Sequence, residues 1–192
     1  MGMTVAVLSG FVVAPAAPWL HRLGRHMSGW MLALLPVVLT VYFGSYIAQV
    51  AAGETFRESY PWAPALGVEL SFYLDGLSLL FALLISGIGA LVVVYAGSYL
   101  AGHGHLGRFY VFLLMFMASM LGLVLSDNLL GLFCFWEGTS ITSYLMIAFK
   151  TTSKSAREGG RRAFIVTGLG GLAMLAGMVL LGQAAGTYSI SG

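Results

Sequence analysis

Charged residues are scarce in this sequence. Aspartate, glutamate, lysine and arginine together make up 8% of the 192 residues, whereas hydrophobic residues make up 59%. A soluble domain carries about 25% charged residues, so this chain lacks the polar surface that a water-exposed protein needs. The composition therefore excludes an ordinary soluble fold and indicates a protein whose solvent is the lipid bilayer of a cell membrane.

Cysteine is almost absent. The one cysteine, Cys134, lies inside an apolar run, so no disulfide can form within the chain, and we interpret it as a small packed side chain. The sequence has no G-x-x-x-x-G-K nucleotide motif, no cysteine–histidine cluster for an iron–sulfur centre and no evident nucleophile–base pair. We therefore expect no cofactor, no bound metal, no nucleic-acid partner and no enzyme active site.

Long apolar runs, by contrast, are abundant. Six stretches are each close to the roughly 20 residues that cross about 30 Å of hydrocarbon. They cover residues 4–20, 30–50, 74–99, 109–125, 129–149 and 163–184. The predicted fold class is all-α, a polytopic membrane bundle of about six transmembrane helices, with residues 1–192 forming a single transmembrane region. The first stretch lacks the positive n-region of a signal peptide, so we expect a retained helix.

The links between these stretches alternate in charge. The second link also contains Pro61 and Pro64, which argue against a continuous helix. The first, third and fifth links are basic, and the fifth has Lys150, Lys154, Arg157, Arg161 and Arg162 against Glu158. The second has Glu54, Glu58 and Glu69 against Arg57, and the fourth has only Asp127. The positive-inside rule places the basic links in the cytoplasm and the N-terminus on the non-cytoplasmic side.

One acidic residue, Glu137, falls in the middle of the fifth stretch, LLGLFCFWEGTSITSYLMIAF. Ten residues separate it from Asp127, so the carboxylate is expected about 15 Å below the outer surface, near the midplane. A charged group there costs at least about 2.5–3.5 kcal/mol and has to face protein or water. Glu137 is therefore our main candidate for a proton or ion path. The alternative is a protonated, hydrogen-bonded residue that only locks helix packing.

The helix face around Glu137 is polar. Cys134, Ser140 and Tyr144 share its side at i, i+3 and i+7 spacing, and Thr139, Thr142 and Ser143 add hydroxyl groups nearby. Such groups can hold water or donate hydrogen bonds to a carboxylate. We therefore add Ser140 and Tyr144 to the predicted path.

Four further charged residues are secondary candidates. Asp75 precedes the third stretch and also fits a helix-end carboxylate. Asp127, with Asn128, also fits a tight turn and an N-cap. Arg161 and Arg162 open the sixth predicted helix, where they either anchor it at the cytoplasmic surface or line an ion entrance.

Two other features are interpreted as non-catalytic. His103 and His105 form a GHGH link, and two histidines at i, i+2 on a loop are weak evidence for a metal site. The sixth stretch is rich in glycine, which favours close helix packing. Its glycines include Gly168, Gly170, Gly171 and Gly177.

The runs FYLDGLSLLFALLISGIGALVVVYAGSYL, SDNLLGLFCFWEGTSITSYLMIAFK and RRAFIVTGLGGLAMLAGMVLLG resemble the large antiporter-like subunits. These include Mrp-type sodium/proton antiporters and the proton-pumping membrane arm of respiratory complex I, and the chain is most similar to the N-terminal part of the Mrp antiporter A subunits. The resemblance implies that Glu137 works against a lysine on a seventh helix, in a fold of two inverted five-helix repeats. The chain would hold the first three helices of one repeat, without that lysine, and is expected to be part of a longer subunit.

The resemblance implies membrane-subunit partners in an antiporter complex, with protons and sodium ions as the transported species. Complex I subunits often carry an acidic residue early in the sixth helix, where this chain has Gly171 in TGLGGL. That departure favours the Mrp type. Two alternatives stay open: a proton-pumping subunit of NADH:quinone oxidoreductase, and a structural membrane subunit that transports nothing.

Overall fold

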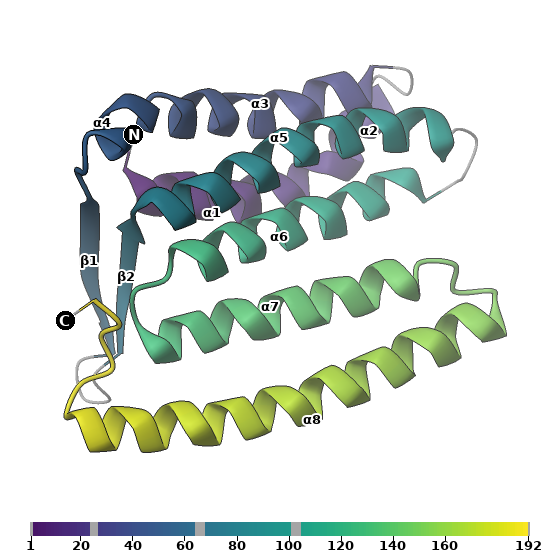
Figure 1. Cartoon of the computed structure of the whole chain (residues 1–192). Coiled ribbons are helices and arrows are strands. Elements are labelled where there is room, and N and C mark those ends of the chain that lie inside the picture. Colours follow the sequence, from purple (N-terminus) through teal and green to yellow (C-terminus); the bar gives the residue numbers. More distant parts are fainter. Residues whose placement is uncertain (1, 24–26, 64–67, 101–104, 192) are drawn as a thin grey trace.

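The computed structural model describes residues 2–23, 27–63, 68–100 and 105–191. The predicted all-α membrane bundle is confirmed, with one small sheet at its edge (Figure 1). Five helical segments are long and apolar enough to cross a membrane: Met3–Arg22, Ser28–Ala51, Gly76–Tyr99, Leu106–Leu125 and Lys154–Ala185. The sixth long helix, α7 (Leu129–Ile147), has 19 residues but is less apolar, because Glu137 and several hydroxyl groups lie within it.

The first two predicted spans are interrupted rather than smooth. Residues of the first form α1 (Met3–Val13), a 3₁₀ turn η1 (Ala14–Ala16) and α2 (Ala17–Leu23). Pro15 lies inside the 3₁₀ turn, where its missing N–H explains the break. The second comprises α3 (Ser28–Gly44) and the short α4 (Ile47–Ala51).

Two of the next three helices begin after residues whose side chains cap them. Helix α5 (Gly76–Tyr99) starts after Asp75, and α7 starts after Asn128, whose side chain accepts hydrogen bonds from the backbone N–H groups of Leu130 and Gly131. Helix α6 (Leu106–Leu125) begins three residues before the predicted stretch. The N-cap predicted for Asn128 is therefore confirmed.

The last helix is longer than predicted. Helix α8 (Lys154–Ala185) follows its N-cap Ser153 and begins nine residues before the stretch predicted from residue 163, so most of the fifth link is helical. The apolar-run criterion missed this part because it is charged. At 1.5 Å per residue, 32 residues extend about 48 Å, well beyond the hydrocarbon layer. Arg161 and Arg162 therefore lie in the third turn of α8 and do not open it.

The second link folds into a β-hairpin that the sequence interpretation did not predict. Strands β1 (Phe56–Ala63) and β2 (Val68–Leu74) pair antiparallel, with Phe56 opposite Leu74 and a register shift between Pro61 and Ala63. Pro61 lies within β1, as the argument against a helix required, while Pro64 lies outside the described residues. The hairpin closes one end of the bundle (Figure 1).

The ends of the helices sort into two groups. The ends of α2, α5 and α7 lie at the same side of the bundle as the starts of α3, α6 and α8, and both chain ends lie at the opposite side with the hairpin (Figure 1). The helix ends that contain Arg22, Arg108 and Lys154 thus share one side of the bundle, and the hairpin and the start of α7 lie at the other, as alternating passes require. The buried core lies among α1, α3, α5 and α6, whereas α8 contacts α7 along one edge and is otherwise widely exposed.

Candidate functional site

Glu137 lies near the middle of α7, in the seam between α7 and α8. Its Oε1 atom is buried and has no hydrogen-bond partner among the described residues. On the facing helix, a Cβ added to Gly171 would overlap this same oxygen. The carboxylate therefore lies directly against the backbone of α8, at a depth where only helices surround it.

An open groove of about 410 Å³ borders the carboxylate. Phe133 and Glu137 contribute to it from α7, and α8 supplies the rest of the lining: Phe164, Ile165, Gly168, Leu169 and Leu172. Apart from Glu137, every lining residue is apolar. The carboxylate is thus the one ionisable group in this part of the seam that the structure describes.

Only some of the polar residues predicted to lie beside Glu137 face the seam between α7 and α8. Tyr144 faces α8, where its ring lies 5.3 Å from that of Phe164. Ser140 is buried but donates no hydrogen bond to the Oε1 atom of Glu137, and Cys134 is exposed. The Thr139 and Thr142 hydroxyl groups donate to carbonyl oxygens of their own helix, at 2.7 Å from Trp136 and from Gly138 respectively, so these two hydroxyls serve the helix backbone.

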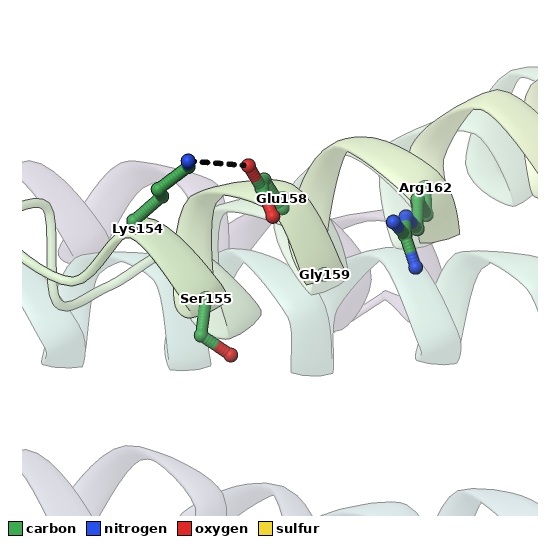
Figure 2. A pocket seen from close by; sticks show the side chains of 5 residues that line it. All are labelled: Lys154, Ser155, Glu158, Gly159 and Arg162. Atoms are coloured by element: carbon green, nitrogen blue, oxygen red, sulfur yellow. Dashed lines mark ion pairs between the residues drawn. The ribbon is translucent and has the colours of Figure 1, made fainter.

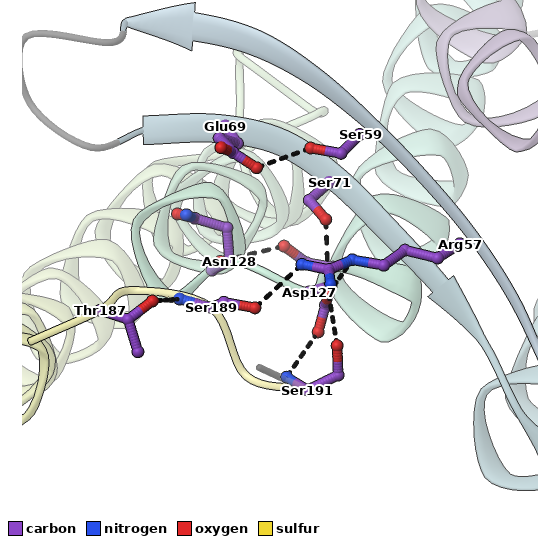
Figure 3. A network of polar contacts seen from close by, with 10 residues as sticks. Arg57, Ser59, Glu69, Ser71, Asp127, Asn128, Thr187, Ser189 and Ser191 are labelled. Atoms are coloured by element: carbon purple, nitrogen blue, oxygen red, sulfur yellow. Dashed lines mark hydrogen bonds and ion pairs between the residues drawn. The ribbon is translucent and has the colours of Figure 1, made fainter. Parts of the chain in front are cut away.

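Asp127 is the centre of a different polar site, at the hairpin end of the bundle (Figure 3). Its side chain is buried, and Oδ2 lies 2.9 Å from Nε of Arg57 in an ion pair. Oδ2 also accepts hydrogen bonds from the hydroxyl groups of Ser71 (3.4 Å) and Ser191 (2.8 Å), and Oδ1 accepts from the Ser191 backbone N–H (2.9 Å). Asp127, which was predicted to lie in a tight turn, therefore also has partners on both of its carboxylate oxygens.

The network joins three segments that are distant in the sequence. Backbone hydrogen bonds run from Asp127 N–H to the Ser71 carbonyl (2.8 Å) and from Ile190 N–H to the Asp127 carbonyl (2.9 Å). Arg57 also donates to the Ser189 hydroxyl at 3.0 Å. The hairpin, the α6–α7 turn and the segment after α8 are thus held together at one point, which we call the Asp127 clamp (Arg57, Ser71, Asp127, Ser189 and Ser191).

Asp75 caps α5. Its side chain accepts from the Ser78 backbone N–H at 2.8 Å, while the Ser78 hydroxyl lies 2.8 Å from the Asp75 backbone N–H, so the two residues form a capping box. The backbone hydrogen bond from Ser78 lowers the pKa of Asp75 and outweighs the opposing effect of burial. The helix-end interpretation of Asp75 accounts for these contacts.

Arg161 and Arg162 lie at the charged end of α8, away from Glu137. Figure 2 shows Lys154, Ser155, Glu158, Gly159 and Arg162 around a surface hollow, with Lys154 and Glu158 paired at 3.9 Å. An exposed pair of this kind contributes little to stability. His105 occupies the N-cap position of α6 without a side-chain cap bond, and His103 lies outside the described residues.

Two residues at the hairpin end were not singled out from the sequence. Arg57 was counted only as a charge in the second link, although it is the one basic residue there. Glu58 accepts hydrogen bonds from the backbone N–H groups of Met3 (2.9 Å) and Thr4 (3.0 Å) and so holds the start of α1. Partial burial alone would raise the pKa of Glu58, but these N–H groups lower it overall.

Two family models match the chain. Residues 62–110 match the family described as NADH-Ubiquinone oxidoreductase (complex I), chain 5 N-terminus. Residues 126–192 match the family described as NADH:quinone oxidoreductase/Mrp antiporter, TM. The second match contains Asp127 and Glu137.

Curated relatives align with almost the whole chain. The Na(+)/H(+) antiporter A subunit of Alkalihalophilus pseudofirmus is 44% identical over 97% of this chain, and the A1 subunit of Staphylococcus haemolyticus is 43% identical over 97%. These alignments cover 24% and 23% of the two relatives, so the chain spans about a quarter of the length of the proteins that it matches.

Solved structures share the fold. A chain of the Mrp complex from Dietzia sp. DQ12-45-1b superimposes with a TM-score of 0.89 at 35% identity, over 100% of this chain and 20% of that one. A chain of the archaeal membrane-bound sulfane sulfur reductase superimposes with a TM-score of 0.78 at 20% identity, over 97% of this chain and 38% of that one, which is a likeness of fold alone. The multi-pass chain therefore belongs to the family of antiporter-like membrane subunits and is similar to the A subunits of Mrp-type Na(+)/H(+) antiporters.

Proposed function

We propose that this chain is part of a subunit of a multi-subunit monovalent cation/proton antiporter, and that Glu137 carries protons along a path through the membrane. Its partners are other membrane subunits of the same complex, and the exchanged ions are protons and sodium. The observation that carries the proposal is a carboxylate oxygen buried at the α7–α8 seam with no hydrogen-bond partner among the described residues. An unpaired acid inside a membrane is too costly to keep as a packing device.

The chemistry follows from this setting. A carboxyl group that alternates between protonated and ionised forms can accept a proton from one side and release it to the other. Its charge acts over long distances here because the surroundings have a low dielectric constant. Basic groups elsewhere in the complex would favour the ionised form and thereby couple proton release to cation movement. Tyr144, on the same face and also against α8, extends the polar edge of the seam.

Glu137→Gln tests the proposal. Glutamine keeps the size of the side chain but cannot release a proton at neutral pH. Everted vesicles containing the complete complex should lose sodium-dependent proton movement when Glu137 is replaced. Glu158→Gln is a suitable control, since the Glu158 side chain is 44% exposed at the charged end of α8 and does not line the groove beside Glu137. Full transport by Glu137→Gln would contradict the proposal and favour a structural subunit.

A proton-pumping subunit of NADH:quinone oxidoreductase is the second candidate. The match of residues 62–110 to a complex I family favours it. The two candidates differ in what drives transport. If proton movement in vesicles follows addition of NADH and does not follow addition of sodium, the oxidoreductase assignment replaces the antiporter.

The orientation of the chain is also a proposal. We infer that the ends of α2, α5 and α7 and the start of α8 face the cytoplasm and that the N-terminus lies outside, because positive charge gathers at one end of the bundle. A Lys154→Cys variant in a Cys134→Ala background should react with an impermeant thiol reagent only from the cytoplasmic side. Labelling from the outside would reverse the orientation.

A further inference from the structure

The helices α7 and α8 meet in a regular antiparallel register. Ala148 lies against Gly160, Tyr144 against Phe164, and Glu137 against Gly171. The separations are four and then seven residues on both helices, so the three contacts belong to one continuous seam. Glu137 is therefore opposite Gly171 because of helix register and not through a chance rotamer.

The buried positions of α8 have one feature in common. They are Gly160, Gly171 and Gly182, and they recur every eleven residues, which is three helical turns. At Gly160 an added Cβ would lie 3.0 Å from the Ala148 Cβ, and at Gly182 it would meet the Tyr188 ring. Each buried glycine thus has a specific neighbour, and at Gly171 that neighbour is a carboxylate oxygen.

Other glycines of this helix do not share this constraint. A Cβ added to Gly168, Gly170 or Gly177 would meet nothing within 4 Å. Gly170 lies about 100° around the helix from Gly171, so the close contact is confined to the side of α8 that faces α7. On that side the atom nearest to an added Cβ at Gly171 is the Oε1 atom of Glu137, and Trp136 Nε1 is farther away.

We infer that Gly171 is a positioning residue for Glu137, and that its missing side chain provides the space in which the carboxylate lies against α8. Any side chain at position 171 would push the carboxylate toward the apolar groove beside Phe133 and Phe164. An acidic side chain there would also add a like charge next to Glu137. The inference rests on the proposed function and deepens it, since a displaced carboxylate would no longer lie on the same proton path.

A glycine-to-alanine series tests this inference in the complete complex. Gly171→Ala should lower sodium-dependent proton transport in vesicles by at least about tenfold, because a misplacement of the reacting group by about 1 Å can cost a hundredfold in rate. Gly170→Ala and Gly177→Ala are matched controls on the same helix and should stay within about twofold of the parent. Equal transport by Gly171→Ala and Gly170→Ala would overturn the inference.

A double-mutant cycle separates carboxylate positioning from general helix packing. Glu137→Asp is shorter by one methylene group and withdraws the carboxylate from α8. Adding Gly171→Ala to Glu137→Asp should then cost much less transport than adding it to the parent. Purely additive losses would mean that Gly171 acts on helix packing and not on Glu137.

A second double-mutant cycle, measured by thermal unfolding, tests the inference without a transport assay. Gly171→Ala should lower the midpoint of thermal unfolding of the complex by about 2–4 °C relative to Gly170→Ala. In a Glu137→Ala background the same change should cost nothing, because the overlapping oxygen is gone. If Glu137→Gln transports normally, the proposed function fails, and this stability cycle still decides whether Gly171 accommodates the carboxylate.

Discussion

Two acidic residues ten positions apart have opposite surroundings. Asp127, at the hairpin end, has an ion pair and three hydrogen-bond donors on its carboxylate. Glu137, in the α7–α8 seam, has a buried oxygen without a partner among the described residues. A paired buried carboxylate holds segments together, whereas an unpaired one can change its protonation state without breaking contacts. The comparison separates an acid that joins three segments from the acid to which we assign the proposed proton path.

The sharpest way to break this comparison is to neutralise each acid in turn. Glu137→Gln should lower transport by about a hundredfold or more, the scale of a lost proton-transfer group, while the folded complex keeps its thermal stability. Asp127→Asn should leave the transport rate per folded complex within a few-fold of the parent. Transport assays normalised to folded protein check both, and an exchange of the two outcomes would reverse our assignment of the two acids.

The stability of the fold should depend on Asp127 and not on Glu137, which is the reverse of the order expected for transport. Asp127→Asn should destabilise the protein by about 2 kcal/mol, because the amide N–H₂ must face either the Ser191 N–H or the Arg57 guanidinium, both of which are donors. Thermal unfolding and protease cleavage of the segment after α8 measure this loss. Unchanged protease resistance would show that the Asp127 clamp does not hold that segment.

Removing Arg57, the basic partner of Asp127 in the ion pair, should destabilise the protein less than Asp127→Asn does. The Arg57 side chain is 43% exposed, so Arg57→Ala should cost about 0.5–1 kcal/mol. Asp127 keeps its donors from Ser71 and Ser191 in this variant. A double-mutant cycle of Arg57→Ala with Asp127→Asn measures the pair directly, and a coupling free energy of zero would remove the ion pair from the clamp.

The smallest expected effect is a pH dependence at Glu58. Its pKa is lowered from the ordinary value of 4.5 by the N–H groups of Met3 and Thr4. A lowered pKa contributes stability that is present above pH 4.5 and is lost as the pH falls through the folded-state value. Protection factors for amide hydrogen exchange at the start of α1, taken relative to the intrinsic exchange rate at each pH, should therefore fall on acidification below pH 4.5, and Glu58→Gln should flatten this response. An identical response in the variant would assign it to another group.

Sequence periodicity and composition predicted the helical elements well but not their connections. The apolar runs identified the membrane helices because a bilayer demands about 20 apolar residues for each crossing. The same criterion missed the first turns of α8, since residues 154–162 are charged and extend beyond the hydrocarbon. It also missed the hairpin, whose two strands are short and make up the whole of the described sheet. Hairpin pairing depends on a register that hydropathy does not encode.

Glu137 and Gly171 show how much of the candidate site could be predicted from the sequence. Glu137 stood out in the sequence because an acid in an apolar run is rare and expensive. Gly171 was interpreted as one of four packing glycines, although the eleven-residue spacing from Gly160 was a usable signal. Only the register of α7 against α8 distinguishes it from Gly170.

The amino-acid sequence by itself determined that the protein lies in a lipid bilayer and that it has about six helices. It also determined the alternation of charge between the two ends of the bundle and the position of Glu137 along its helix. These features depend on local composition and on the thickness of a bilayer. The tertiary structure decided which acid is paired, because Arg57 reaches Asp127 only after the hairpin folds over the α6–α7 turn. It also decided that Gly171 faces Glu137. Both facts depend on contacts between segments far apart in the chain, which local pattern alone does not specify.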